Sequence, residues 1–356
     1  MRFYPVKVVK LSHDTPDSVA IELEIPAENR EEFKFLSGQY LTFRHHFDGE
    51  EIRRSYSIAC SPNNTNLTIG VKQIGQGIFS TFANSVLKVG DTLEVAPPQG
   101  NFINKAQKGE RKSFCFIAAG SGITPIISLI QNILATDETA TCCLYFVNKN
   151  TRHIMFRELI EDQKNMFPTR FEVHYFLSKE KTDAPLFNGR LDFEKFCNIH
   201  QVQPFDFFDE CFLCGPEQML LDFQKFRLEN CPNLKLHYEL FTTTTPANKS
   251  LDPIAIKKFE GKESEVTIKI DGLMIDLKVP YNGLSILEAA LEASADLPFA
   301  CKGGVCCTCR AKLVEGEVEM RVNYALEPDE VEDGYVLTCQ SQPRSPKVVI
   351  DFDEGH

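Results

Sequence analysis

The sequence predicts a multidomain protein with three folds in series: an antiparallel β-barrel, an α/β domain with a parallel sheet, and a small α+β domain of the β-grasp kind. Three successive patterns predict this order. Short alternating strands fill about the first 100 residues, strands then alternate with helices, and a hairpin, a helix and a cysteine-rich loop follow. A chain of 356 residues is long enough for two or three domains, each with a core of its own.

The first part of the chain has the alternation and the turn spacing of short antiparallel strands. One stretch, 77–87, interrupts them, and its Phe79, Phe82 and Val86 are spaced for one face of a helix. We therefore expect a small antiparallel barrel with one helix. Its strands are predicted at 3–12, 18–25, 38–47, 53–59, 66–74 and 92–100.

From Lys112 onward, apolar strands alternate with helices. Strands are predicted at 114–120, 141–147 and 170–177, and helices at 121–135 and 152–167. This βαβ alternation is typical of a parallel sheet. A doubly wound sheet of this kind normally binds a nucleotide at the carboxyl ends of its strands.

The segment 242–263 lacks any period and is the predicted linker. Beyond it, two strands flank Asp271-Gly272, which is a hairpin signal, and a helix is predicted at 285–294. Strand, strand, helix and then a cysteine loop is the order of a β-grasp domain. The segments 335–343 and 347–353 supply returning strands.

Four cysteines in the last domain follow the spacing C-x4-C-x2-C, with the fourth after a further 29 residues: Cys301, Cys306, Cys309 and Cys339. This spacing is the thiolate pattern of a plant-type [2Fe-2S] cluster. Structural zinc sites usually pair two short C-x2-C units, so the isolated fourth cysteine favours the cluster over zinc. Gly303 and Gly304 suit a loop whose N–H groups point at sulfur. Cys307 is out of register and is predicted not to bind iron.

The charge and the cysteine content exclude several classes of protein. Acidic residues outnumber basic ones by 50 to 38, and no basic stretch is interleaved with aromatic residues, so we expect no nucleic-acid partner. There is no apolar run of the length of a signal peptide or a membrane span. We expect a cytoplasmic protein without stable membrane association, whose other cysteines are free thiols.

The tetrapeptide Arg54-Ser55-Tyr56-Ser57 resembles the R-x-Y-S signature of the ferredoxin reductase superfamily. The resemblance implies that Arg54 meets a flavin phosphate, that Tyr56 lies against the isoalloxazine, and that Ser57 hydrogen-bonds near the flavin N5. Taken alone the motif is equally compatible with an ordinary exposed strand. The G-x-x-S segment that begins at Gly77 is also similar to the family, and it implies flavin pyrophosphate and ribityl contacts at Gly77, Ser80, Val71 and Lys72.

Two further motifs resemble the nicotinamide site of the same superfamily. The segment 120–125 follows an apolar strand and is similar to G-x-G-x-x-P, and about 90 residues later 214–219 is similar to C-G-P-x-x-M. A strand-to-helix turn without a ligand is the alternative for the glycine loop alone. The resemblance implies that Cys214 lies beside the nicotinamide, with cofactor contacts at Gly120, Gly122, Thr124, Pro125, Gly215 and Pro216.

Glu239 and Phe241 resemble the end of plant-type reductases, where a glutamate assists near the nicotinamide and an aromatic residue covers the flavin. Here the aromatic residue is Phe and the chain continues beyond it. Ser178 and Lys179 resemble a pair that grips the 2′-phosphate of NADP, which favours NADPH over NADH. The alternative is a pair of solvated basic residues in a loop.

The resemblance spans nearly the whole chain. It implies a flavin-binding barrel at 1–105, an NAD(P)-binding domain at 106–241 and a plant-type ferredoxin domain at 264–356, with FAD expected rather than FMN. It implies an electron-transfer enzyme that passes electrons from NAD(P)H through the flavin to the cluster and on to an oxygenase. Domain order and length most resemble the reductase components of phenylacetyl-CoA epoxidases. Reductases of other oxygenases or of hybrid-cluster proteins, and a non-enzymatic redox sensor, are the alternatives.

Overall fold

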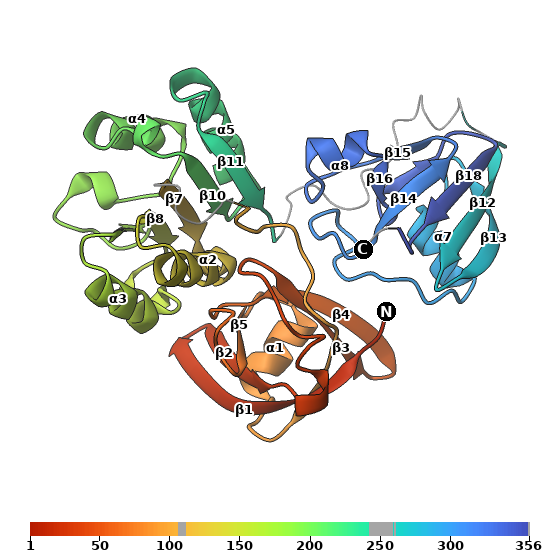
Figure 1. Cartoon of the computed structure of the whole chain (residues 1–356), viewed down its shortest axis with the longest axis horizontal. Helices are drawn as coiled ribbons and strands as arrows, with labels where there is room; N and C mark the ends of the chain where they lie inside the picture. Colours follow the sequence, from red (N-terminus) through yellow and green to blue (C-terminus); the bar gives the residue numbers. More distant parts are fainter. Residues whose placement is uncertain (106–111, 242–258, 260, 355–356) are drawn as a thin grey trace. The chain divides into compact units, whose positions relative to one another are not determined.

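The structure is a computed structural model that describes residues 1–105, 112–241, 259 and 261–354. It contains two compact units, Arg2–Phe241 and Thr242–His356. The first holds an antiparallel sheet and a parallel sheet, and the second holds a smaller mixed sheet (Figure 1).

The first unit begins with a six-stranded antiparallel sheet that closes into the predicted barrel. In spatial order its strands are β4 (Glu50–Ser57), β3 (Tyr40–Phe47), β6 (Thr92–Val95), β1 (Tyr4–Thr15), β2 (Ser18–Glu24) and β5 (Leu67–Lys72). An antiparallel bridge between Ile58 and Ile69 joins the end of β4 to β5. Alternating residues such as Val6 and Ile21 fill the interior, and Phe79 of α1 (Ile78–Ser85) packs into the same core.

The second part of this unit is a five-stranded sheet in which all strands are parallel, as predicted. Its spatial order is β11 (Lys235–Glu239), β10 (Glu210–Cys214), β7 (Ser113–Ala119), β8 (Thr141–Asn148) and β9 (Phe171–Leu177). Figure 1 shows α2 (Ile123–Thr136) and α3 (Arg157–Met166) on one face and α4 (Phe193–Val202) and α5 (Glu217–Asn230) on the other. The strand order reverses between β7 and β10, which is where such sheets bind ligands.

The prediction of a single helix over 152–167 was wrong for its first residues. A short 3-10 turn, η3 (Thr151–His153), comes first, and α3 begins only at Arg157. The Asn150 side chain accepts a hydrogen bond from the N–H of Arg152, and Phe156 has a left-handed φ of 55°. This tight turn separates the two segments. The other 3-10 turns are η1 (Ala27–Asn29), η2 (Gly120–Gly122), η4 (Pro185–Phe187) and η5 (Phe205–Phe207).

The barrel and the parallel sheet pack directly against each other. The Ser128 hydroxyl of α2 donates to the carbonyl of Cys60 at 2.6 Å. A Cβ atom on Gly70 of β5 would lie 2.8 Å from the Phe156 ring and 2.9 Å from the Thr124 methyl group. This close packing brings the ends of β4 and β5 near the loops of the parallel sheet.

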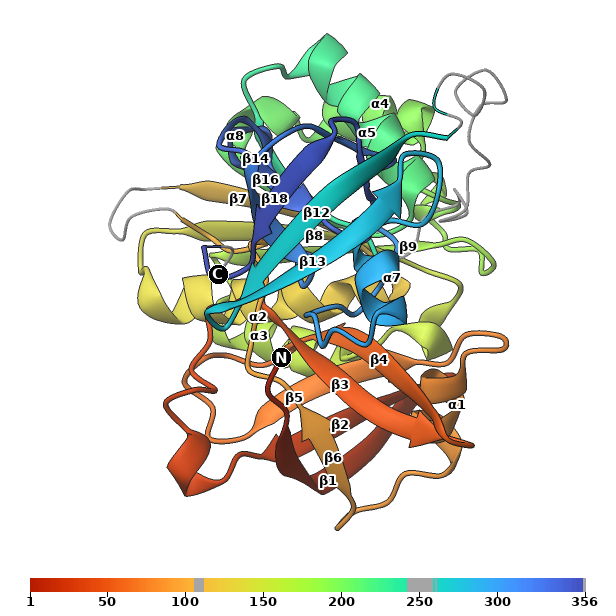
Figure 2. The same ribbon diagram turned by 90° about the vertical axis from the view of Figure 1, so that its right-hand side faces the viewer.

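The second unit has the predicted β-grasp order. Its mixed sheet runs β13 (Leu273–Pro280), β12 (Glu263–Ile270), β18 (Lys347–Asp351), β14 (Arg310–Glu315) and β16 (Tyr335–Leu337), with β12 and β18 parallel (Figure 2). Asp271 and Gly272 both have positive φ, as a two-residue hairpin turn requires. Ser285 caps α7 (Ile286–Glu292) through a capping box. The shorter elements are β15 (Val318–Met320), α8 (Pro328–Glu332) and β17 (Ser341–Pro343).

Most of the predicted linker, 242–263, lies outside the described residues, and β12 already begins at Glu263. Among the helices that the structure describes, none has the length and the apolar character needed to cross a membrane.

Candidate functional site

A cavity of about 640 Å³ lies at the carboxyl edge of the parallel sheet. Its lining comes from the loops that follow β7, β8, β9 and β10, and from Lys72 at the end of β5 in the barrel. Gly120, Ser178 and Pro216 are sequence-predicted residues that line it. This is the crevice in which doubly wound sheets bind nucleotides.

Three glycines lie where the ends of β7 and β10 come close to each other. Gly120 has a left-handed φ of 55°, and a Cβ atom on Gly122 would lie 2.1 Å from the carbonyl oxygen of Cys214. A Cβ atom on Gly215 would lie 2.3 Å from the Met219 methyl group. At Gly122, where the neighbour is backbone, only a residue without a side chain fits. The structure thus brings the two predicted halves of the nicotinamide site together.

Thr124 and Pro125 have a different surrounding from the glycines before them. Both are buried in the first turn of α2, and the Thr124 hydroxyl donates to the carbonyl of Ser121 at 3.0 Å. Through this hydrogen bond and their burial, they stabilise the conformation of the glycine loop.

Asn148 is a cavity residue that the sequence motifs did not identify. It ends β8, only 4% of its surface is exposed, and it lines the cavity. Among the described residues, neither its side-chain oxygen nor its side-chain nitrogen has a hydrogen-bond partner. A buried amide without a partner is costly, and a polar ligand in the cavity would relieve that cost. The residues present therefore fit a dinucleotide.

The loops after β8 and β9 are joined through their backbones. The N–H and the hydroxyl of Ser178 donate to the carbonyl of Asn148, and the N–H of Lys179 donates to the carbonyl of Lys149. Ser178 and Lys149 line the cavity. The predicted 2′-phosphate pair thus lies at the outer part of this edge, next to a second lysine.

On the flavin side, Arg54, Tyr56 and Ser57 lie near the end of β4. The Arg54 guanidinium is exposed and donates to the carbonyl of Arg53. The half-buried Tyr56 ring packs edge-on against Phe43, with its centroid 5.9 Å away. Burial raises the pKa of the Tyr56 phenol, which keeps it protonated. An exposed guanidinium beside an aromatic face suits the phosphate and the ring of a flavin.

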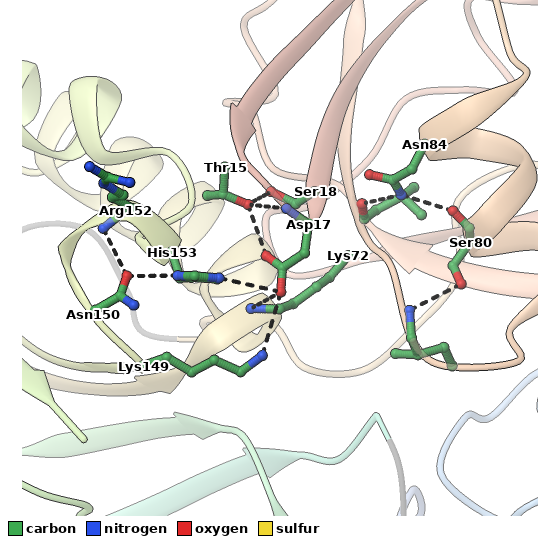
Figure 3. A network of polar contacts seen from close by, with 12 residues as sticks. Thr15, Asp17, Ser18, Lys72, Ser80, Asn84, Lys149, Asn150, Arg152 and His153 are labelled. Carbon is green, nitrogen blue, oxygen red and sulfur yellow. Dashed lines mark hydrogen bonds and ion pairs between the residues drawn. The ribbon is translucent and has the colours of Figure 1, made fainter. Parts of the chain in front are cut away.

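The Gly77 segment is held by its own hydrogen bonds, and Figure 3 shows Ser80 and Asn84, which make several of them. The Ser80 hydroxyl donates to the carbonyl of Gly77 and accepts from the N–H of Ile74. The Asn84 amide donates to the carbonyls of Val71 and Ser80. Ser80 and Val71 therefore fix the end of β5 against α1, which sets the position of Lys72.

The three residues predicted to be catalytic come from three strands and meet at one place. Cys214 and Glu239 are register partners at the ends of β10 and β11, and the Ser57 hydroxyl of β4 donates to a Glu239 carboxylate oxygen at 3.5 Å. Burial raises the pKa of Glu239 to about 8, against the opposing effect of the Ser57 hydrogen bond. Burial, with the Glu239 charge, raises the pKa of Cys214 well above its usual range. Phe241, two residues later, is 37% exposed.

In the second unit, the cysteine loop directs polar groups at sulfur. The Cys306 thiol donates to Cys301 Sγ at 3.1 Å, and the N–H of Gly303 donates to the same sulfur at 3.3 Å. The Cys306 thiol, together with the backbone N–H groups of Gly303, Cys306 and Val305, lowers the pKa of Cys301 to about 6. Such a nest of N–H groups stabilises thiolate and sulfide charge.

The fourth cysteine returns to this loop through a backbone connection. The N–H and the hydroxyl of Thr338 both donate to the carbonyl of Cys309, at 3.1 and 3.0 Å. Gln340 donates to Cys339 Sγ at 3.6 Å and to the carbonyl of Lys302 at 3.0 Å. The donor set of three loop thiols and one returning thiol fits a plant-type [2Fe-2S] cluster.

Three family descriptions match the chain in succession. They are an oxidoreductase FAD-binding domain at residues 5–103, an oxidoreductase NAD-binding domain at 116–225 and a 2Fe-2S iron-sulfur cluster binding domain at 268–344. These matches support FAD, NAD(P)H and [2Fe-2S] as the cofactors.

Similar folds occur in solved structures. Phthalate dioxygenase reductase, a modular structure for electron transfer from pyridine nucleotides to [2Fe-2S], matches with a TM-score of 0.56 and 22% identity over 98% of both chains. An intact type IV self-sufficient cytochrome P450 monooxygenase matches with a TM-score of 0.72 and 21% identity, over 98% of this chain and 41% of that one. Both likenesses concern the fold.

Several relatives match along nearly their whole length. A component of the 1,2-phenylacetyl-CoA epoxidase of Escherichia coli is 38% identical over 99% of this chain and 98% of its own. The ferredoxin reductase component of the 3-ketosteroid-9-alpha-monooxygenase of Rhodococcus rhodochrous is 28% identical over 95% and 94%. With all three domains present in this order, the chain belongs to the ferredoxin reductase family, as an oxidoreductase with FAD-binding, NAD-binding and C-terminal [2Fe-2S] domains.

Proposed function

We propose that the protein is the reductase component of a phenylacetyl-CoA epoxidase, which passes electrons from NAD(P)H through FAD to its [2Fe-2S] cluster and on to a di-iron oxygenase component. The observation that carries the electron-transfer part is the meeting of Ser57, Cys214 and Glu239 at the edge of the parallel sheet that holds the nucleotide cavity. When bound, the flavin takes two electrons from the nicotinamide, and the cluster carries one at a time.

The chain's own residues would orient the two cofactors. The glycine loop at Gly120 and Gly122 offers backbone N–H groups to the pyrophosphate of NAD(P)H, and the unpartnered amide of Asn148 offers a polar contact deeper in the cavity. Arg54 would hold a flavin phosphate, and Tyr56 would pack on the ring. Phe241, at the end of the first unit, would cover the flavin when the nicotinamide is away.

Glu239 would hold a proton beside the place of electron transfer. Its raised pKa keeps the carboxyl protonated near neutral pH, where it can exchange a hydrogen bond with the Ser57 hydroxyl. Burial likewise keeps the Cys214 thiol neutral. Near neutral pH, neither the Cys214 thiol nor the Glu239 carboxyl therefore adds a negative charge at this place.

In the second unit, Cys301, Cys306, Cys309 and Cys339 would hold the cluster. The N–H groups at Gly303 and Val305 would stabilise its negative charge. No disulfide joins the cysteines, all of which lie among the described residues; this favours a reducing compartment, and we place the reaction in the cytoplasm.

The identity of the oxygenase rests on the relatives. The 38% identical relative is a component of a phenylacetyl-CoA epoxidase, whereas the 3-ketosteroid-9-alpha-monooxygenase component is 28% identical. The higher identity over the whole chain favours the epoxidase as the electron acceptor. A ring-hydroxylating or steroid oxygenase is the second candidate.

The test has two stages. Purified protein with flavin and cluster is titrated with NADPH or NADH without oxygen, and the flavin absorbance is expected to bleach. The oxygenase components of a phenylacetyl-CoA epoxidase are then added with phenylacetyl-CoA and O2, and epoxide is expected to form only when this protein is present. No bleaching with both groups bound contradicts the reductase proposal. Bleaching without epoxide contradicts only the choice of acceptor.

A further inference from the structure

Asp17 occupies a position between the barrel and the nucleotide domain (Figure 3). It lies in the turn between β1 and β2, where its carbonyl accepts from the N–H of Gln73 at 2.8 Å and the Thr15 hydroxyl donates to Asp17 Oδ1 at 3.1 Å. These contacts fix the carboxylate, so that Oδ2 points away from the turn. The Asp17 side chain is 23% exposed.

Three cationic or basic groups surround Asp17 Oδ2. Lys72 Nζ of β5 lies 3.7 Å away, Lys149 Nζ lies 3.6 Å away, and His153 Nε2 lies 4.0 Å away. The His153 ring is oriented because its Nδ1–H donates to Asn150 Oδ1 at 2.7 Å. All three distances exceed that of a close hydrogen bond. The Asp17 carboxylate therefore attracts all three groups electrostatically and does not form a close ion pair with any one of them.

Both lysines also line the nucleotide cavity. Lys72 Nζ is 3.7 Å from the place that a Cβ atom on Gly120 would take, so its ammonium lies beside the glycine loop. Lys149 lies next to Ser178 and Lys179 on the outer side of the cavity. Lys72 and Lys149 thus lie at the two ends of the region where the phosphates of a dinucleotide would lie. The Asp17 carboxylate lies close to both.

The charges around the cavity are close to balance. Among the described lining residues, Lys72, Lys149 and Arg190 are basic, and Asp192 and Asp222 are acidic. Asp17, which stands behind the two lysines, supplies one more negative charge. An anionic nucleotide must therefore draw the lysines from Asp17 to itself.

We propose that Asp17 is an internal competitor of the nucleotide phosphates, which holds Lys72 and Lys149 until a nucleotide binds and so weakens the binding of NAD(P)H and of the oxidised product. This proposal rests on the proposed function only in that the cavity binds a nicotinamide nucleotide. The effect must be larger for NADP than for NAD, because the 2′-phosphate adds negative charge near the lysines. Asp17 is a positioning residue and takes no part in the electron transfer itself.

The test compares the affinities of the full-length protein, with flavin and cluster bound, for NADP+ and NAD+. Affinity is measured by flavin difference absorbance at low and at high salt. At low salt, Asp17→Asn should bind NADP+ about 5- to 20-fold more tightly than the wild type and NAD+ only about 2- to 4-fold more tightly. Both gains should shrink at high salt. Asp17→Glu keeps the charge and should bind like the wild type.

The matched control is Asp162→Asn, which makes the same change of net charge at an exposed position on α3 and should leave both affinities unchanged. In a Lys72→Met, Lys149→Met background, Asp17→Asn should have no effect on affinity. Unchanged or weaker NADP+ binding by Asp17→Asn, or an equal gain for both nucleotides, would overturn the inference. Failure of the wild type to bind either nucleotide would instead contradict the proposed function.

Discussion

The fold changes the charge state of Glu239 near neutral pH. Burial raises the pKa of its carboxyl from 4.5 to about 8. Between these values the folded state binds a proton that the unfolded state has lost, so this group's contribution to stability falls as pH rises through that window. If the protonated Glu239 carboxyl supports electron transfer from the nicotinamide to the flavin, ionisation of Glu239 should lower the rate of that transfer at high pH.

We predict that the rate of flavin reduction by NADPH falls above pH 8 in the wild type and does not fall in Glu239→Gln. Near pH 6.5 the two rates should agree within about threefold, because the amide imitates the protonated carboxyl. Stopped-flow absorbance from pH 6 to pH 10 measures both profiles. Glu158→Gln, on the exposed start of α3, is the control and should follow the wild type. A fall with the same midpoint in Glu239→Gln would assign the titration to another group.

Cys307 illustrates what spacing alone can predict. It stands between two predicted cluster ligands, and its carbonyl accepts from the N–H of Arg310. We predict that Cys307→Ala keeps the iron content and the visible absorbance of the cluster, whereas Cys306→Ala loses both, because only Cys306 is in the plant-type register. Iron analysis and electron paramagnetic resonance of the reduced proteins measure this. Loss of the cluster in Cys307→Ala would mean that the register was assigned wrongly.

Residues that belong to motifs could be predicted from the sequence, and residues that depend on long-range contacts could not. Cys214 and Gly215 were found because their chemistry recurs at a fixed spacing after an apolar strand. Asn148 and Asp17 carry no such spacing. Asn148 stands out only because its buried amide has no partner among the described residues, and Asp17 because two domains place lysines around it.

At the scale of elements, periodicity predicted the strands better than it predicted the beginning of α3. The apolar strands of the parallel sheet are long enough to give a clear signal. The stretch 152–167 also reads as helical, but the side chain of Asn150 caps a separate 3-10 turn and Phe156 adopts a left-handed conformation. The packing of the Phe156 ring near Gly70 of the barrel favours this local conformation. Tertiary contact thus overrides the helical pattern there.

Gly122 lies where the loop between β7 and α2 packs against the end of β10, and a substitution there tests how close this packing is. A Cβ atom would lie 2.1 Å from the carbonyl oxygen of Cys214, and backbone cannot yield cheaply. We predict that Gly122→Ala lowers the free energy of unfolding of the first unit by about 2–3 kcal/mol and raises the KM for NADPH. Gly75→Ala, with no heavy atom within 4 Å, should change stability by less than about 0.5 kcal/mol. Urea unfolding followed by flavin fluorescence compares them, and equal stability would contradict the packing argument.

At the scale of the whole molecule, the chain divides the two redox groups between two compact units. The residues proposed to hold the flavin lie in Arg2–Phe241, and the cluster cysteines lie in Thr242–His356. Because both units belong to one chain, we expect electron transfer from the nucleotide to the cluster to be intramolecular, with a rate that does not depend on protein concentration. The order of domains therefore predicts an order of events, in which the nucleotide is the entrance and the cluster is the exit.

Cys301→Ser tests that exit, because it removes a cluster ligand and leaves the first unit unchanged. Reduction of ferricyanide by NADPH, which the flavin can serve directly, should stay within about twofold of the wild type, whereas cytochrome c reduction and epoxidase turnover should fall at least about 100-fold. Cys307→Ser is the matched control and should keep all three activities. If cytochrome c reduction survived in Cys301→Ser with iron analysis showing no cluster, electrons would leave from the flavin, and the second unit would have to serve another purpose such as docking the oxygenase.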